Sequence, residues 1–300
     1  MSQRKVGGKA TEELTCVIGM HRSGTSLTAE LCHTLGWRVT GPEDFLRQGN
    51  EYNRQGYWET SQLVTINRRI LYSLGGDWNV IPRLESNWPH APALRALRNR
   101  ARDFIQQIPT PKSTWKDPRL TLTLAFWQPL LPPTRYIICL RNPLDVAFSL
   151  HRRDGMDTQW ALTLWMFYTS QALIQTQGLA RLPIFYEDFI GPSHAMHAQR
   201  IQHFLEANSE PRFHSVIHPG LSHGHHGLKP MVSEDPIPRT VKDLWEGLLD
   251  WRESGYADDS RIMNLARSYR APRTQWTTAK KFRLSFWMRY VKMQVLEAKK

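Results

Sequence analysis

A glycine-bounded segment near the amino terminus has the residue types and spacing of an anion-binding loop. Residues 19–24 follow a short β-branched run at 15–18 and precede an amphipathic stretch that begins near Thr25. A strand, a tight loop and a helix N-terminus direct backbone N–H groups and the positive end of a helix dipole at one point. The pattern therefore predicts a site for a phosphate-like group, with Arg22 as a fixed cation inside the loop.

The loop differs from that of nucleoside triphosphatases. Its spacing is G-x-x-x-x-G, but Thr25 and Ser26 follow where the Walker A motif has lysine and then serine or threonine. The lysine that reaches the β- and γ-phosphates of a triphosphate is absent. We therefore expect a phosphate-like ligand and a poor fit to an ATPase.

A second cationic segment, residues 135–153, predicts another anion site beside the first. Arg141 ends an apolar run, and Ser149 follows eight residues later in a predicted helix. Neighbouring parallel strands end at the same edge of a sheet, so Arg141 should reach the first loop. A guanidinium binds phosphate through two parallel hydrogen bonds, and Arg153 adds positive charge nearby.

These segments need a parallel sheet to bring them together. Apolar strand patterns alternate with helical ones, which predicts an α/β fold of three layers, with a central, mostly parallel sheet and helices on both faces. Strands are expected at 15–18, 37–39, 113–116, 135–142 and 182–189, and helices near 26–36, 61–74, 91–107, 119–130, 143–153 and 157–178. We expect a flexible lead-in at 1–13, a single domain at 14–275 and a basic amphipathic tail at 276–300.

Composition restricts the setting and the partners. The 300 residues carry 39 basic and 27 acidic side chains, a net charge of +12, which favours anionic partners without choosing among them. Three cysteines imply no disulfide framework. The chain lacks a signal-peptide pattern and an apolar run long enough to span a bilayer, so we expect a cytoplasmic protein.

The two anion segments resemble the PAPS-dependent sulfotransferases, which use 3′-phosphoadenosine 5′-phosphosulfate (PAPS) as sulfuryl donor. HRSGTS at 21–26 resembles the family's 5′-phosphosulfate loop, and Arg141 and Ser149 match the spacing of its 3′-phosphate ligands. The resemblance implies a P-loop-like sulfotransferase fold, with adenosine 3′,5′-bisphosphate as a product. The implied loop contacts are His21, Arg22, Ser23, Gly24, Thr25 and Ser26.

Three further segments extend the resemblance over residues 14–235. LPIFYEDF resembles a strand end that places Tyr186 near the adenine and ribose. STWKDPRL is similar to a turn of the tyrosylprotein branch in which Lys116 steadies the transferring sulfuryl oxygens, although Lys116 could instead pair with Asp117. GLKPM resembles a late closing loop and implicates Lys229. The match favours the bacterial, carbohydrate and tyrosylprotein branches, which use a glutamate base.

The resemblance leaves the catalytic base open among three carboxylates. Glu43 lies 21 residues after Arg22, a placement similar to the catalytic glutamate of the tyrosylprotein and heparan branches. Glu59 is the rival and Asp44 the third candidate. Arg22 and Lys116 complete the expected catalytic set. The acceptor is expected to be a hydroxyl, first on a carbohydrate, and no metal is required because the cations are built in.

Two other functions stay as alternatives. A P-loop kinase would need the missing loop lysine, and a nucleic-acid-binding protein would need a continuous basic face. We expect no nucleic acid as partner, because many of the cations lie in the anion-site motifs. We also expect the tail to pack on its own domain rather than on a membrane.

Other chemistry-bearing residues have plainer interpretations. A cluster of histidines invites a zinc hypothesis, but its spacing fits no recognisable zinc motif, so a solvated loop is favoured. It comprises His218, His223, His225 and His226. Trp58, Trp78 and Trp88 lie in predicted loops, where stacking on sugars and packing in the core are equally open.

Overall fold

The computed structural model describes residues 13–39, 56–107, 112–209 and 236–269, and its core is a five-stranded parallel sheet. The strand order is β2-β3-β1-β4-β5. The strands are β1 (Glu13–Gly19), β2 (Arg38–Val39), β3 (Lys112–Lys116), β4 (Thr134–Leu140) and β5 (Arg181–Phe185). All pairings are parallel, so the carboxyl ends of the strands share one edge of the sheet.

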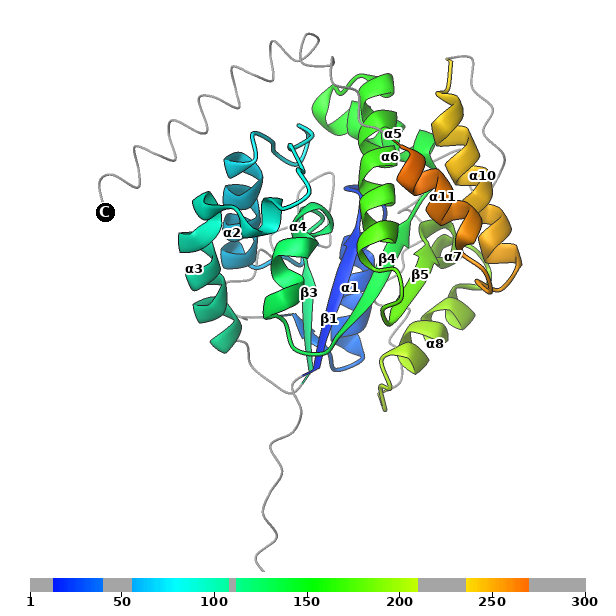
Figure 1. The fold of residues 1–300 in the computed structure, drawn as a ribbon. Coiled ribbons are helices and arrows are strands. Elements are labelled where there is room, and N and C mark those ends of the chain that lie inside the picture. The colour runs from blue at the N-terminus through cyan, green and yellow to red at the C-terminus, as the bar shows by residue number, and fades with distance from the viewer. Residues whose placement is uncertain (1–12, 40–55, 108–111, 210–235, 270–300) are drawn as a thin grey trace, which may run out of the picture.

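Helices cover both faces of this sheet: α1 and α8 pack on one face, and the helices from α2 to α6, with α10 and α11, pack on the other. Figure 1 shows α2 and α3 towards one edge of the sheet and α10 and α11 towards the other. The helices that follow the first strands are α1 (Thr25–Thr34), α2 (Ser61–Ser73), α3 (Arg95–Gln106) and α4 (Leu120–Trp127). The later helices are α5 (Pro143–Asp154), α6 (Thr158–Gln175), α7 (Tyr186–Ile190), α8 (His194–Phe204), α10 (Arg239–Glu253) and α11 (Ser260–Ser268).

Alternation along the central strands divides the core into two layers. Ile18 and Ile138 lie in the large cluster built with α2–α6, α10 and α11, whereas Val17 and Ile137 lie in a smaller cluster with α1 and α8. Successive side chains of a strand point to opposite faces, so a sheet covered on both sides needs apolar residues at every position. The uninterrupted apolar runs of the sequence therefore become the two central strands.

The predicted fold class is confirmed, although several element bounds differ. Strand β1 extends beyond the predicted 15–18 to Glu13–Gly19, and other bounds differ where proline or a turn intervenes. Helix α3 begins at Arg95 because Pro92 opens a separate 3₁₀ turn, Pro92–Leu94. Helix α4 ends at Trp127, before a 3₁₀ turn over Gln128–Leu130. The strand predicted to include Tyr186 ends at Phe185.

The ends of the chain fall largely outside the described residues. This applies to the predicted lead-in, to the tail at 276–300 and to the boundary at 275, which all stay predictions. Within the described ranges, no helix has both the length and the apolar character needed to cross a membrane.

Asn67 of α2 joins three elements through buried hydrogen bonds. Its Nδ2 donates to Asp117 Oδ2 at 2.9 Å, just beyond β3. Its Oδ1 accepts from Thr123 Oγ1 at 2.7 Å and from Trp127 Nε1 at 2.8 Å, both on α4. Asp117 in turn binds Arg119 at 2.8 Å. Asn67 therefore fixes the turn that follows Lys116.

We predict that Asn67→Ala lowers the free energy of unfolding by about 3 kcal/mol, because it leaves several buried polar groups without partners. Urea denaturation measures this loss. Gln62→Ala, at an exposed position of the same helix, is the control and should stay within about 0.5 kcal/mol of the wild type. An equally small effect of Asn67→Ala would contradict the role assigned to this network.

Candidate anion-binding site

The loop between β1 and α1 is held in an unusual backbone conformation. Gly19 has φ +141°, and a Cβ atom there would lie 2.4 Å from the carbonyl oxygen of Cys139. The Gly19 N–H donates to Thr121 Oγ1 at 2.9 Å, which fixes the start of the loop against α4. Arg22 has φ 69°, a left-handed conformation that is uncommon for residues other than glycine. Such strain is concentrated at functional sites, which makes this loop a candidate site.

Gly24 ends the loop and begins α1. Its φ is 87°, and an added Cβ would lie 2.7 Å from the ring of Tyr186. Helix α1 starts at the next residue, Thr25, so the N–H groups of its first turn face the loop. The predicted arrangement of strand, loop and helix N-terminus is thus present.

Arg141 and Ser149 both contact the loop arginine, although they lie more than a hundred residues away in sequence. Arg22 Nε donates to Ser149 Oγ at 2.8 Å, and Arg141 Nη1 donates to the carbonyl oxygen of Arg22 at 2.9 Å. The Arg141 guanidinium carbon lies 4.2 Å from the centre of the Tyr186 ring, a cation–π contact. The two predicted anion segments therefore form one cluster: Arg22, Arg141, Ser149 and Tyr186.

The cations of this cluster, Arg22 and Arg141, form no ion pair with a carboxylate of the described residues. Burial lowers the pKa of Arg22 to about 10, and the charges of Arg153 and Arg141 add to the effect. Ser23 Oγ and Arg141 Nε are also buried without a hydrogen-bond partner in the described part of the chain. An anion bound here would relieve the repulsion and supply the missing acceptors.

Lys116 and Glu59 form a buried ion pair close to the loop. Lys116 Nζ lies 2.6 Å from Glu59 Oε1, and it also donates to the carbonyl oxygen of Tyr57 at 2.6 Å. Ser26 Oγ donates to the same carbonyl at 3.3 Å. Trp58, between them, has φ 53°. The segment at 56–59 therefore bends sharply to connect the anion loop with the end of β3.

Arg119 completes this second cluster. It lies 2.8 Å from Asp117 Oδ1 and 3.8 Å from Glu59 Oε2. Because Asp117 binds Arg119 and Asn67, the alternative pairing of Asp117 with Lys116 does not occur. Glu59 instead lies between two cations, which hold its carboxylate in place.

His21 lies beneath Trp78 and remains uncharged. Its ring centroid is 4.7 Å from that of Trp78 and 5.9 Å from that of Tyr168. Burial lowers the pKa of His21 well below its usual range, and Arg119, Arg153 and other nearby cations lower it further. Arg153 lies on Trp78 at 5.2 Å and pairs with Asp154. Trp78 thus lies between the loop and helix α5.

Most predicted site residues come together in this region. The loop residues adjoin Arg141, Ser149 and Tyr186, while Lys116 adjoins Glu59. Glu43, Asp44, Lys229, the four clustered histidines and the tail lie outside the described residues. Tyr186 packs against Arg141 and Gly24, and its contact with adenine or ribose stays a prediction.

Several contributors were not identified from the sequence. Arg119 looked like a turn residue, and Tyr57 contributes only a backbone carbonyl, which no sequence pattern reveals. Trp58 and Trp88 belong to the core, with 5% and 8% of their surface exposed, rather than to a sugar-binding surface. Trp78 alone of the three adjoins the loop.

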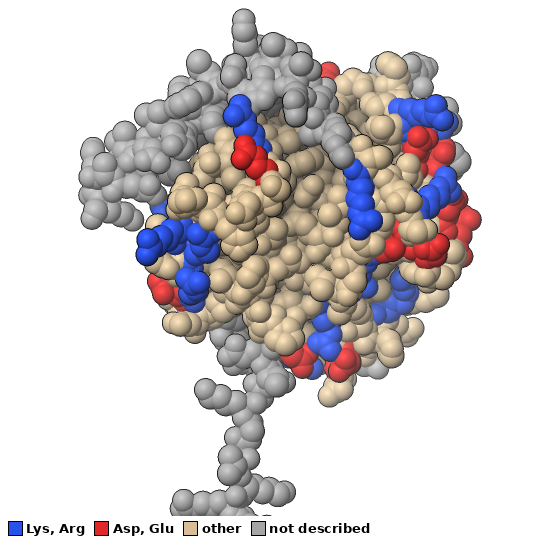
Figure 2. Space-filling model, in the orientation of Figure 1, with Lys and Arg blue, Asp and Glu red and all other residues tan. Residues whose placement is uncertain are grey.

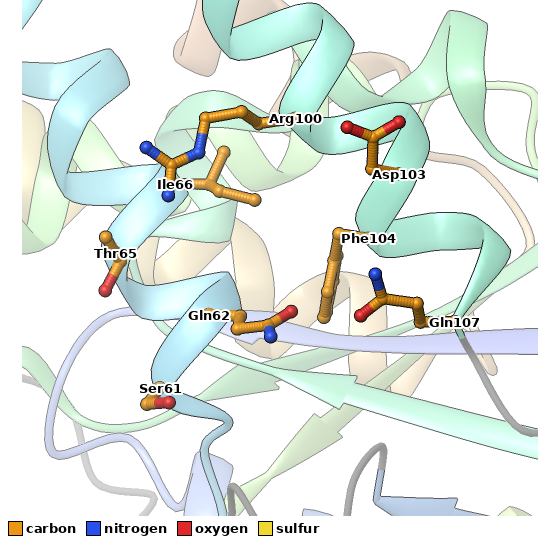
Figure 3. Close-up of a pocket in the computed structure, with 8 residues that line it drawn as sticks. All are labelled: Ser61, Gln62, Thr65, Ile66, Arg100, Asp103, Phe104 and Gln107. Carbon is orange, nitrogen blue, oxygen red and sulfur yellow. The ribbon is translucent and has the colours of Figure 1, made fainter.

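A cavity of about 270 Å³ lies between α2 and α3, separate from the cationic cluster (Figure 3). Its floor is formed by Ile66 and Phe104, and its walls are polar. The lining residues are Ser61, Gln62, Thr65, Ile66, Arg100, Asp103, Phe104 and Gln107. Ser61 lies two residues beyond Glu59, so one chain segment contributes to both the second cluster and this cavity.

No protein-family model matches the sequence, and no curated protein matches it. Solved structures with some likeness include the sulfotransferase domain of the Synechococcus PCC 7002 olefin synthase. It is 16% identical with a TM-score of 0.41, and the match covers 91% of this chain and 100% of that one.

Two other solved structures show similarly low values. Sulfotransferase STF9 from Mycobacterium avium is 15% identical with a TM-score of 0.39, over 67% of this chain and 65% of that one. The sulfotransferase domain from the curacin biosynthetic pathway is 13% identical with a TM-score of 0.41, over 91% of this chain and 98% of that one. At these values, the functional assignment of the chain has to rest on its own residues.

Proposed function

We propose that this protein is a sulfotransferase that moves a sulfuryl group from PAPS to an acceptor hydroxyl. The observation that carries the proposal is the buried cluster of Arg22 and Arg141 with Ser149 at the N-terminus of α1, whose cations form no ion pair among the described residues. The resemblance of residues 21–26 and of the Arg141–Ser149 spacing to the PAPS-dependent family supports it.

The residues present fit a nucleotide with phosphate at both ends. The loop N–H groups, Ser23 Oγ and Arg22 would hold the 5′-phosphosulfate. Arg141 and Ser149 would hold the 3′-phosphate. Arg22 Nε donates to Ser149 Oγ at 2.8 Å, so a hydrogen bond joins the residues assigned to the two anions.

The second cluster has the groups that sulfuryl transfer needs. Bound PAPS supplies the sulfur–oxygen bond that breaks when the acceptor oxygen attacks sulfur, so that adenosine 3′,5′-bisphosphate leaves with the electron pair of that bond. Lys116 would stabilise the sulfuryl oxygens, and a carboxylate would take the hydroxyl proton. The contact of Glu59 with Lys116 supports Glu59 in this role, while Glu43 remains the rival base. Lys116, Arg22 and Arg141 supply the positive charge, so we propose no metal.

The cavity between α2 and α3 supports a carbohydrate as acceptor. Amide, hydroxyl and charged groups surround a floor that includes an aromatic ring, a composition suited to a polar ligand with apolar ring faces. Figure 3 shows the Arg100 guanidinium extending over this cavity towards Thr65. Among the described residues it forms no hydrogen bond or ion pair.

The alternative functions have weaker support. The loop lysine of a kinase is missing, as the sequence indicates. Figure 2 shows lysines and arginines in separate groups on the visible face of the described residues, some beside acidic residues, and no continuous basic band. A nucleic-acid-binding surface of the expected kind is therefore not favoured on this face.

We predict that adenosine 3′,5′-bisphosphate binds more tightly than ADP or ATP–Mg²⁺ in calorimetric titrations. Arg141→Ala should weaken bisphosphate binding by roughly 10- to 100-fold, because charge-assisted hydrogen bonds are lost. Arg102→Ala, which removes an exposed arginine from α3, should leave binding unchanged. A preference for ATP–Mg²⁺, or no effect of Arg141→Ala, would count against the proposal.

We predict that replacing the base lowers turnover by roughly 10²- to 10⁴-fold while bisphosphate binding persists. Glu59→Gln and Glu43→Gln should be compared in single-turnover assays with PAPS. Loss in only the Glu59 variant assigns the base to Glu59, and loss in only the Glu43 variant assigns it to Glu43. Full activity in both would exclude both carboxylates as the base.

We predict that Arg100→Ala raises KM for a carbohydrate acceptor by roughly tenfold, with kcat nearly unchanged, because the residue binds acceptor away from the reacting atoms. Arg95→Ala on the same helix is the matched control, since Arg95 does not line the cavity. Equal KM values for the two variants would remove the cavity from the acceptor site.

A further inference from the structure

The turn between β5 and α7 supports Arg141 with two successive residues. The centre of the Tyr186 ring lies 4.2 Å from the guanidinium carbon of Arg141. The Glu187 side chain contacts the backbone of Asn142, the residue that follows Arg141. Glu187 Oε1 accepts a hydrogen bond from Asn142 N at 2.9 Å. One turn therefore contacts both the side chain of Arg141 and the backbone that carries it.

The Arg141–Asn142 segment determines where helix α5 begins. Asn142 Oδ1 accepts from Leu144 N at 3.0 Å, which caps the helix, and Trp165 Nε1 donates to the Arg141 carbonyl at 2.9 Å. Helix α5 also carries Ser149. Displacement of the Glu187 contact would therefore move both residues assigned to the 3′-phosphate.

Glu187 is buried among groups of both charges. Burial raises its pKa to about 7, against the backbone N–H groups of Asn142 and of Glu187 itself and the charge of Arg141, which all lower the pKa, while Asp145 on α5 raises it. Its Oε2 is buried and has no hydrogen-bond partner in the described part of the chain. The neighbouring carboxylate, Asp188, is paired with Arg252 on α10 and His197 on α8, so those charges are directed to the other side of the turn.

We propose that Glu187 is a positioning residue that holds the Arg141–Asn142 turn and, through its own protonation, sets the affinity of the site for a 3′-phosphate. Protonated Glu187 keeps the hydrogen bond from Asn142 N and leaves the charge of Arg141 to the ligand. Ionised Glu187 adds a negative charge that competes with the phosphate for Arg141. This inference rests on the proposed function, because it assumes that a 3′-phosphate binds at Arg141.

The direction of the pH dependence follows from this charge balance. A dianionic phosphate beside Arg141 makes ionisation of Glu187 still less favourable, so ligand binding raises its pKa and takes up protons. Affinity should therefore fall as pH rises through about 7. The phosphate itself loses its second proton near pH 6, and this raises affinity as pH rises. The effect of Glu187 should therefore be measured above roughly pH 6.5, where the phosphate is already dianionic.

Glu187→Gln separates these effects, because the neutral amide retains an acceptor for Asn142 N and cannot ionise. Calorimetric titration with adenosine 3′,5′-bisphosphate between about pH 6.5 and 8.5 should show wild-type affinity falling roughly tenfold relative to the variant, equivalent to a coupling of one pKa unit. Titrations in two buffers of different ionisation enthalpy should show proton uptake that is smaller in Glu187→Gln. Asp188→Asn, one residue further along the same turn, is the matched control and should retain the wild-type pH profile.

The variant also reports on folding. The folded-state pKa of Glu187 exceeds its unfolded value, so its stabilising contribution is lost as pH rises through about 7. The thermal midpoint of Glu187→Gln should therefore gain on the wild type as pH rises from about 4.5 to 7 and then stay level. A cooperative unfolding transition of the variant between about pH 6.5 and 8.5 shows that it is folded where binding is measured.

The outcomes separate this inference from the proposed function. Parallel pH profiles for the wild type and Glu187→Gln, with tight bisphosphate binding in both, would overturn the role of Glu187 and leave the sulfotransferase proposal intact. Absence of bisphosphate binding to the wild type at every pH would overturn the nucleotide site itself. A tenfold divergence confined to Glu187→Gln would support the inference.

Discussion

Repulsion between two guanidinium groups is the constraint around which the site is arranged. Arg141 donates to the carbonyl of Arg22, and no carboxylate among the described residues forms an ion pair with either cation. Holding like charges together away from water costs free energy unless a bound anion offsets the repulsion. The fold meets this cost with neutral supports: a hydroxyl from Ser149, the ring of Tyr186 and the backbone carbonyl of Arg22. Because these supports are neutral, the positive charge of the two arginines stays available to a bound anion. Carboxylates in salt bridges with the arginines would neutralise that charge.

The second cluster follows the opposite electrostatic strategy. Lys116 and Glu59 neutralise each other at 2.6 Å, with Arg119 and Asp117 beside them. A paired base and cation can remain buried together, and the carbonyl of Tyr57 joins them to the start of α1 by accepting from both Lys116 and Ser26. The site therefore has two parts: the Arg22–Arg141 cluster, whose positive charge suits an anion, and the Lys116–Glu59 cluster, whose charges neutralise each other. We assign nucleotide binding to the first cluster and proton transfer to the second.

The anion loop and the strands were predictable because their signals are local. Apolar runs specify buried strands, glycines mark the loop, and parallel topology brings Arg141 to it. The ion pair of Lys116 with Glu59 was not predictable, because a contact between residues 57 positions apart depends on how the chain at 56–59 bends. Trp58 shows the same limit: its loop position left sugar stacking and core packing equally open, and only the structure shows that its ring is buried in the core. Glu187 looked like part of a strand end, and only its hydrogen bond to Asn142 gives it a role.

The contact between Gly24 and Tyr186 links two segments that lie far apart in the chain. A methyl group at position 24 would meet the Tyr186 ring at 2.7 Å, so a larger residue there requires a smaller one at 186. A smaller residue at 186 removes the aromatic face on which Arg141 rests. Positions 24 and 186 therefore cannot vary independently. A larger residue at 24 needs a smaller one at 186, and that smaller residue no longer supports Arg141. Substitutions in the anion loop and in the β5–α7 turn are therefore expected to occur together.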